Sequence, residues 1–148
     1  MKIYLDNCCF NRPYDEPSHE TIILETHAKI SIQKIIKEGK IDLIWSFILE
    51  FENNENPYED QYLAILDWKN IAGRIISPSE IIRDRAKTFI KTGIKPKDSL
   101  HISCAIEGKA DYLVTTDQKL IKKCGHMTEI KILNPIDLIY IIEMEGIL

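Results

Sequence analysis

The chain has 148 residues, of which 45% are hydrophobic and 28% are charged, and its formal net charge is −4. This length and composition fit one folded domain over residues 1–148 and exclude an intrinsically disordered chain. The acidic balance argues against tight, non-specific binding to nucleic acids, because proteins that bind in this way are usually basic.

The sequence carries no segment that predicts membrane insertion or export. Its apolar runs are far shorter than the ~20 residues of a membrane-spanning helix. The first six residues, Met1–Asp6, include a carboxylate and lack the apolar region of a signal peptide. The four cysteines, Cys8, Cys9, Cys104 and Cys124, form no C-x-x-C pair. We therefore expect a cytoplasmic protein with reduced cysteines and no membrane partner.

In chain order, the first predicted elements are a strand over about residues 2–6, a loop over residues 7–17 and a long helix over residues 19–38. Ser18 can cap this helix, and Gly39 ends it. A second strand over residues 41–45 leads to a short helix over residues 47–53, for which Ser46 is the predicted N-cap. Apolar residues at helical spacing predict the buried face of the long helix: Leu24, Ala28, Ile32, Ile35 and Ile36.

The next two helices begin with similar proline-containing patterns. In Asn56-Pro57-Tyr58-Glu59, Asn56 is the predicted N-cap of a helix that ends near Ala72. By the same logic, Ser77-Pro78-Ser79-Glu80 predicts a helix that ends near Gly93, after a short strand over residues 73–76. The remaining elements are a helix from Lys97 or Asp98 to Gly108, a strand over residues 111–115, a short helix over residues 117–123, a strand over residues 129–133 and a C-terminal helix capped by Asn134.

This alternation of strands and helices predicts an α/β fold with a mainly parallel sheet that helices cover on both faces. The strand order is less constrained than the alternation. The order 3-2-1-4-5 would place the first and fourth strands side by side. Asp6 and Asp117 would then share one edge of a site.

Three aspartates lie where a strand ends or a helix begins. Asp6 ends the first strand, Asp117 follows the strand over residues 111–115, and Asp98 opens a helix on the face that also carries Ile102 and Ala105. In open α/β folds the site lies at the carboxyl ends of the strands. Each aspartate also has a structural interpretation, because Asp98 and Asp117 can be helix N-caps and Asp6 can form a turn.

Two glutamates lie on the short helix that follows Ser46. Glu50 and Glu52 are two residues apart, so about 200° of rotation separates them and only one can face the site. Several carboxylates at one edge would repel one another, and a hard divalent cation such as Mg²⁺ or Mn²⁺ relieves that repulsion. Such a cation can polarise a phosphoryl oxygen and activate water.

With these residues, the chain resembles PIN-domain nucleases over nearly its whole length. The resemblance implies a three-layer α/β/α sandwich with a five-stranded, mainly parallel sheet. It also implies Mg²⁺- or Mn²⁺-dependent hydrolysis of RNA phosphodiester bonds. The segments that carry the resemblance are Lys2–Asn7, Ser46–Glu52, Lys97–Ala105 and Ala110–Asp117.

The resemblance assigns catalytic and metal-binding roles to four acids. Asp6, Asp98 and Asp117 match the aspartates of the family. Glu52 matches its helical glutamate when Ser46 is aligned with the usual serine six residues earlier, and Glu50 is the alternative.

Three further residues are predicted to contact the substrate. Asn7 and Thr116 match small polar residues that flank the site, and Arg12 can contact an RNA phosphate. His101, three residues after Asp98, could act as a base, but metal-bound hydroxide makes that unnecessary, so His101 is predicted to pack in the interior.

The resemblance also implies partners. Many bacterial and archaeal members of the family are VapC-type toxins of toxin–antitoxin pairs and are often homodimers, so it implies RNA, a cognate antitoxin and a second copy of the chain as partners. The segments Cys8–Asp15 and Glu52–Pro57 depart from typical toxins and indicate an atypical subfamily. The alternative function is a catalytically weak protein of this fold that binds RNA or another protein.

Overall fold

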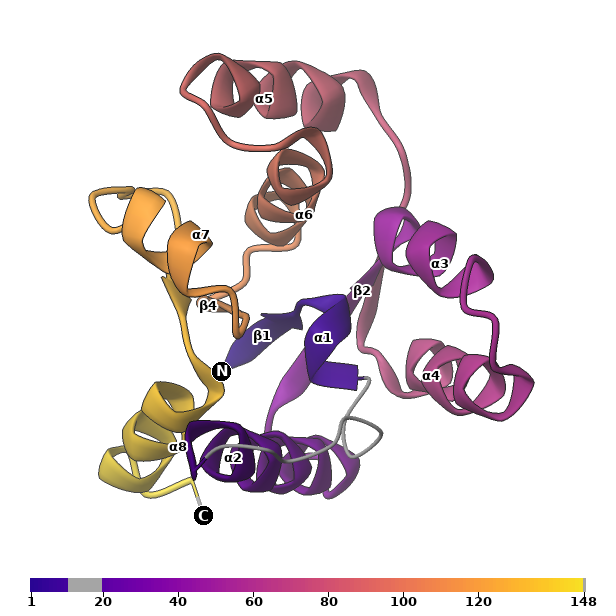
Figure 1. Ribbon diagram of the computed structural model, residues 1–148, viewed down its shortest axis with the longest axis vertical. Coiled ribbons are helices and arrows are strands. Elements are labelled where there is room, and N and C mark those ends of the chain that lie inside the picture. Colours follow the sequence, from indigo (N-terminus) through magenta and orange to yellow (C-terminus); the bar gives the residue numbers. More distant parts are fainter. Residues whose placement is uncertain (11–19, 148) are drawn as a thin grey trace.

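A parallel sheet forms the centre of the structure (Figure 1). The computed structural model describes residues 1–10 and 20–147, and within them the sheet has five strands in the order β3-β2-β1-β4-β5. All neighbouring strands pair in parallel, which confirms the predicted fold class and strand order. The strands are β1 (Lys2–Leu5), β2 (Asp42–Ser46), β3 (Arg74–Ile76), β4 (Tyr112–Val114) and β5 (Lys131–Leu133).

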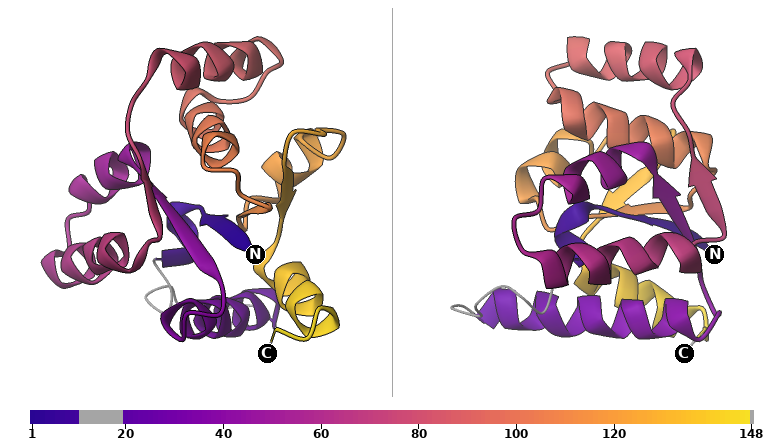
Figure 2. Two further views of the ribbon diagram at one scale, coloured as in Figure 1. Left: turned by 180° about the vertical axis from the view of Figure 1, so that it is seen from behind. Right: turned by 90° about the vertical axis from the view of Figure 1, so that its right-hand side faces the viewer.

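Helices cover both faces of this sheet (Figure 2). In the views of Figures 1 and 2, α2 and α8 pack together on one side, and α6 lies on the opposite side with α5 outside it. No helix in the described ranges is long and apolar enough to cross a membrane. The helices are α1 (Asn7–Phe10), α2 (Glu20–Lys37), α3 (Phe47–Asn54), α4 (Glu59–Ile71), α5 (Glu80–Lys91), α6 (Pro96–Glu107), α7 (Gln118–Lys123) and α8 (Pro135–Met144).

The central strand is buried on both faces. Ile3, Tyr4 and Leu5 are each 0% exposed. The sequence of this strand is an unbroken apolar run, which is typical of parallel strands covered by helices on both faces. Because the hydroxyl of Tyr4 is buried with its ring, it needs a hydrogen-bond partner, and this requirement bears on the site below.

The segment after β1 differs from the predicted loop. Residues 7–10 form α1, whose first turn is closed by a hydrogen bond from the Cys9 amide to the Asp6 carbonyl at 2.9 Å. Two side chains of α2 donate hydrogen bonds to carbonyl groups of α1. Lys29 Nζ donates to the Cys8 carbonyl and Gln33 Nε2 to the Cys9 carbonyl, both at 2.9 Å. The predicted cap Ser18 and the predicted RNA contact Arg12 lie outside the described residues.

The predicted buried face of α2 is wrong at one residue, Leu24. Leu24 is 58% exposed, whereas its neighbour Glu25 is 6% exposed and Lys29 is 2% exposed. The amide of Asn134 donates to the Glu25 carboxylate, which explains how a charged group can replace an apolar one on this face. Ala28, Ile32, Ile35 and Ile36 are buried as predicted.

Several helix starts were predicted one or two residues from their position. In α4 the N-cap is Tyr58, and Asn56 Oδ1 instead accepts a hydrogen bond from the Tyr58 amide at 3.0 Å in the preceding turn. In α5 the N-cap is Ser79, whose hydroxyl accepts from the Ile82 amide, rather than Ser77. The predicted caps Ser46, Asp117 and Asn134 are confirmed, because each side chain accepts a hydrogen bond from an amide of its own helix.

Candidate metal-binding site

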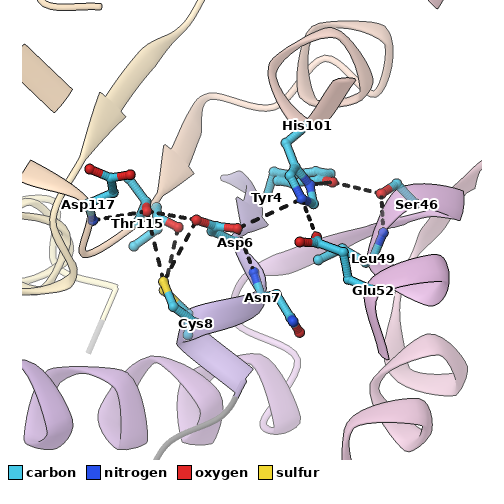
Figure 3. A network of polar contacts seen from close by, with 12 residues as sticks. Tyr4, Asp6, Asn7, Cys8, Ser46, Leu49, Glu52, His101, Thr115 and Asp117 are labelled. Carbon is cyan, nitrogen blue, oxygen red and sulfur yellow. Dashed lines mark hydrogen bonds and ion pairs between the residues drawn. The ribbon is translucent and has the colours of Figure 1, made fainter. Parts of the chain in front are cut away.

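Asp6 lies at the carboxyl edge of the sheet between β1 and β4. Its amide donates to the Val114 carbonyl at 2.9 Å, which extends the pairing of the two strands by one residue. Its Oδ2 atom accepts a hydrogen bond from the Thr115 hydroxyl at 2.8 Å, and the same hydroxyl oxygen accepts from the Asp117 amide at 3.2 Å (Figure 3). Thr115 is fully buried and therefore fixes Asp6 relative to the start of α7.

Glu52 and His101 approach Asp6 from the other side (Figure 3). His101 Nε2 is hydrogen-bonded to Glu52 Oε1 and lies 3.9 Å from Asp6 Oδ1. One potential ligand atom from each of the three side chains lies within 4.8 Å of the other two, a spacing at which they could hold a metal ion. Glu50 is not part of this group, because its Oε1 atom lies 2.7 Å from Lys69 Nζ on α4.

His101 does more than the predicted interior packing. It is 3% exposed, but both of its ring nitrogens make hydrogen bonds. Burial lowers the pKa of His101, but the hydrogen bond to Glu52 and the negative charges of Asp6, Glu52 and Asp98 outweigh it, so the pKa lies above its usual value. The sequence did contain a sign that His101 could reach the site. His101 lies three residues after Asp98, and this spacing places both side chains on one side of α6.

Asp98 is the third residue of α6 and not its N-cap, because the helix begins at Pro96. Burial raises the pKa of Asp98, and the negative charges of Asp6 and Asp117 raise it further. Asp117 is exposed and accepts a hydrogen bond from the Leu120 amide through Oδ1, so it caps α7 while it adds its charge to the cluster. Asp98 and Asp117 lie outside the three-residue group of Asp6, Glu52 and His101.

Of the predicted substrate contacts, Asn7 contacts Asp6 directly, and Thr116 contacts Cys8. The backbone amide of Asn7 donates to Asp6 Oδ1 at 2.7 Å, while its side chain points away from that carboxylate (Figure 3). The Thr116 hydroxyl donates to the Cys8 sulfur at 3.4 Å. Thr115, which sequence reasoning missed, is the threonine that bonds Asp6.

The donor set fits a divalent cation. Its oxygens come from carboxylates, the ligands that hard divalent cations prefer, and the negative charges of Asp6 and Asp117 add to burial in raising the pKa of Asp98.

Three solved structures share this architecture. One is VapBC2 from Rickettsia felis bound to a promoter DNA fragment, with a TM-score of 0.56 and 18% sequence identity over 90% of this chain and 98% of that chain. Another is VapBC-1 from nontypeable Haemophilus influenzae, with a TM-score of 0.53 and 20% identity over 91% of this chain and 98% of that chain. The third is DNA-bound VapBC from Salmonella typhimurium, with a TM-score of 0.52 and 14% identity over 91% of this chain and 98% of that chain. The chain has a PIN-like fold. No protein-family model matches the sequence, and no curated protein matches it either.

One side chain of this PIN-like site is a thiol. Cys8 Sγ lies 3.8 Å from Asp6 Oδ2 and 3.9 Å from the sulfur of Cys9. The hydrogen bond with the Cys9 thiol lowers the pKa of Cys8 to about 7. The other three thiols are buried, and their pKa values are raised, for Cys104 to about 12. We therefore expect Cys8 to be the most reactive of the four thiols.

We expect iodoacetamide at pH 7.5 to alkylate Cys8 about tenfold faster than Cys9, Cys104 or Cys124, because about half or more of Cys8 is thiolate at that pH and Cys8 is partly exposed. Mass spectrometry of the digested protein at timed intervals measures the four rates. Cys8→Ser should leave a protein that is almost unreactive. Faster labelling of Cys124 or Cys104 would contradict the assignment.

Proposed function

We propose that this chain is an endoribonuclease that hydrolyses RNA phosphodiester bonds with Mg²⁺ or Mn²⁺ bound by Asp6, Glu52, Asp98 and Asp117. The observation that carries the proposal is the convergence of Asp6, Glu52 and His101 at the carboxyl edge of the sheet, with the charges of Asp98 and Asp117 nearby. When bound, the cation would polarise a phosphoryl oxygen and lower the pKa of a bound water.

The protein's own residues would hold the acids in place for this chemistry. Thr115 fixes the orientation of Asp6 through Oδ2, and the start of α7 holds Asp117. Asn7 contacts Asp6 and Thr116 contacts Cys8, and we propose that Asn7 and Thr116 contact the RNA, together with Arg12.

We also propose a biological setting. The similar structures are VapBC assemblies, so a cognate antitoxin is the proposed partner, and the protein would act as a toxin in the cytoplasm. A homodimer is the proposed form of the free chain.

The test is cleavage of labelled structured and unstructured RNA with Mn²⁺, Mg²⁺ or EDTA. We expect cleavage with either metal, none with EDTA, and a loss of about tenfold to 100-fold in Asp98→Asn, since a catalytic metal supplies several kcal/mol of charge stabilisation. The matched control is Asp137→Asn. Asp137 is also the third residue of a helix that begins with proline, but it is exposed and lies on α8, away from the cluster.

The thermal midpoint of the metal-free variants shows whether a loss of activity reflects unfolding. Because the pKa of Asp98 is raised in the folded state, its ionised form destabilises that state above the raised pKa. Asp98→Asn should therefore be as stable as the wild type or more stable at neutral pH. Equal cleavage by the wild type and Asp98→Asn would indicate a contaminating nuclease, and no cleavage by either would favour a protein that only binds RNA or a partner.

A further inference from the structure

A chain of buried hydrogen bonds runs from Glu52 back to the start of its own helix (Figure 3). Beyond the Glu52–His101 contact, His101 Nδ1 lies 2.6 Å from the Tyr4 hydroxyl, and that hydroxyl lies 2.6 Å from Ser46 Oγ. Ser46 Oγ in turn accepts a hydrogen bond from the Leu49 amide at 3.3 Å. Tyr4 and Ser46 are 0% exposed, so water does not compete for these bonds.

The Glu52 end of this chain fixes its direction. An ionised carboxylate can only accept a hydrogen bond. Above the raised pKa of His101, where the ring is neutral, the His101 Nε2–H therefore donates to Glu52 Oε1, Tyr4 donates to His101 Nδ1, and Ser46 donates to Tyr4.

The chain connects the three elements that form one side of the site. Tyr4 precedes Asp6 by two residues, and the two-residue period of a strand places both side chains on the same face of β1. Ser46 ends β2 and caps α3, the helix that carries Glu52, while His101 comes from α6. The ring of Tyr4 also meets the ring of His101 edge-on, with centroids 5.6 Å apart.

We infer that Tyr4 is a positioning residue, which holds His101 as the Nε2–H tautomer and through it orients the Glu52 carboxylate toward the cation. The inference rests on the proposed function, because it assigns Glu52 to the metal. Within residues 1–10 and 20–147, Oε1 is the Glu52 oxygen that is hydrogen-bonded, which leaves Oε2 for the metal. Tyr4 itself contacts neither metal nor substrate in this arrangement.

The test compares Tyr4→Phe with Tyr112→Phe in the full-length chain. Both variants remove one phenol hydroxyl and keep the ring. Tyr112 lies on β4, opposite Ile3 in the register of the sheet, and its hydroxyl is outside the chain of hydrogen bonds described above. The first readout is the pair of imidazole nitrogen chemical shifts of His101 by NMR, recorded on metal-free protein at one pH above the raised pKa of His101, where the ring is neutral. The second is the affinity for Mn²⁺ by calorimetry.

We expect the wild type and Tyr112→Phe to show a single Nε2–H tautomer, and Tyr4→Phe to show a mixture of tautomers with about three- to tenfold weaker Mn²⁺ binding, the effect of losing one hydrogen bond. Ser46→Ala, which cuts the chain one link further away, should change the shifts in the same direction by less. It also replaces Tyr4→Phe as the decisive variant if that protein does not fold.

Unchanged His101 shifts in a folded Tyr4→Phe would overturn the inference, as would equal loss of Mn²⁺ affinity in Tyr112→Phe. Failure of the proposed function has a different signature. If the wild type bound no Mn²⁺, the metal would be wrong, and with it the orientation of Glu52 toward the metal. The shifts of the metal-free proteins would still decide whether Tyr4 sets the tautomer of His101.

Discussion

Glu52→Gln is expected to lower metal-dependent RNA cleavage by at least about 100-fold, whereas Glu50→Gln should leave it within about twofold. The substitution at Glu52 keeps the shape of the side chain but removes the charge that faces Asp6 and His101. A loss of about 3 kcal/mol of transition-state stabilisation corresponds to this factor, and a catalytic metal contributes on that scale. Glu50 instead pairs with Lys69 at the surface, where a salt bridge is worth at most about 1 kcal/mol of stability.

The two variants form a matched pair, because they change the same residue type two positions apart on α3. Single-turnover cleavage of one labelled RNA with saturating Mn²⁺ gives both rates. Calorimetric titration with Mn²⁺ then shows whether the loss lies in metal binding. If Glu50→Gln were the more damaging substitution, the glutamate assigned to the site would be wrong.

Gly108→Ala is expected to reduce the free energy of unfolding by about 1–3 kcal/mol, the usual effect of an added methyl group in a packed core. A Cβ atom at Gly108 would lie 2.9 Å from both Cδ1 and Cγ2 of Ile44, a residue of β2 that is 1% exposed. Gly108 has a φ of −75°, so the backbone accepts alanine and the effect is steric. Because Gly108 ends α6, this contact sets how closely the helix of Asp98 and His101 packs on the sheet.

The control for this substitution is Gly73→Ala, since no atom lies within 4 Å of the Cβ that it would add. That variant should be unchanged or slightly more stable, because alanine restricts the unfolded chain. Urea unfolding at one pH measures both. A Gly108→Ala protein as stable as Gly73→Ala would show that Ile44 moves aside without cost.

The sequence was sufficient for features that depend on neighbouring residues. The parallel sheet follows from the alternation of strands and helices, and the caps Ser46, Asp117 and Asn134 follow from short polar residues before helical segments. It was not sufficient for α1, a helix of four residues, which is too short to be stable through its own bonds. Its carbonyl groups are held by Lys29 and Gln33, more than 20 residues away in the sequence.

The candidate site was predictable to a similar depth. The positions of Asp6, Asp98 and Asp117 at the ends of elements were visible in the sequence, but helical phase could not choose between Glu50 and Glu52. The choice depends on which face of α3 packs toward α1 and α6. That face carries Glu52, whereas Glu50 pairs with Lys69 of α4. Thr115 was missed, and the hydrogen bonds of His101 were not predicted, because their partners Asp6 and Tyr4 lie 109 and 97 residues away and only the folded sheet brings them together.

The position of β1 in the middle of the sheet has a consequence for synthesis of the protein. The ribosome makes β1 first, and its neighbour β4 begins 110 residues later, at Tyr112. Until then a partly made chain can pair β1 only with β2, and its other edge remains open to pairing with other chains. A nascent chain that has emerged only through α5 contains neither Asp98 nor Asp117. The full set of proposed metal-binding acids therefore exists only after Asp117 has been made, and the proposed cleavage of RNA is not expected from shorter nascent chains.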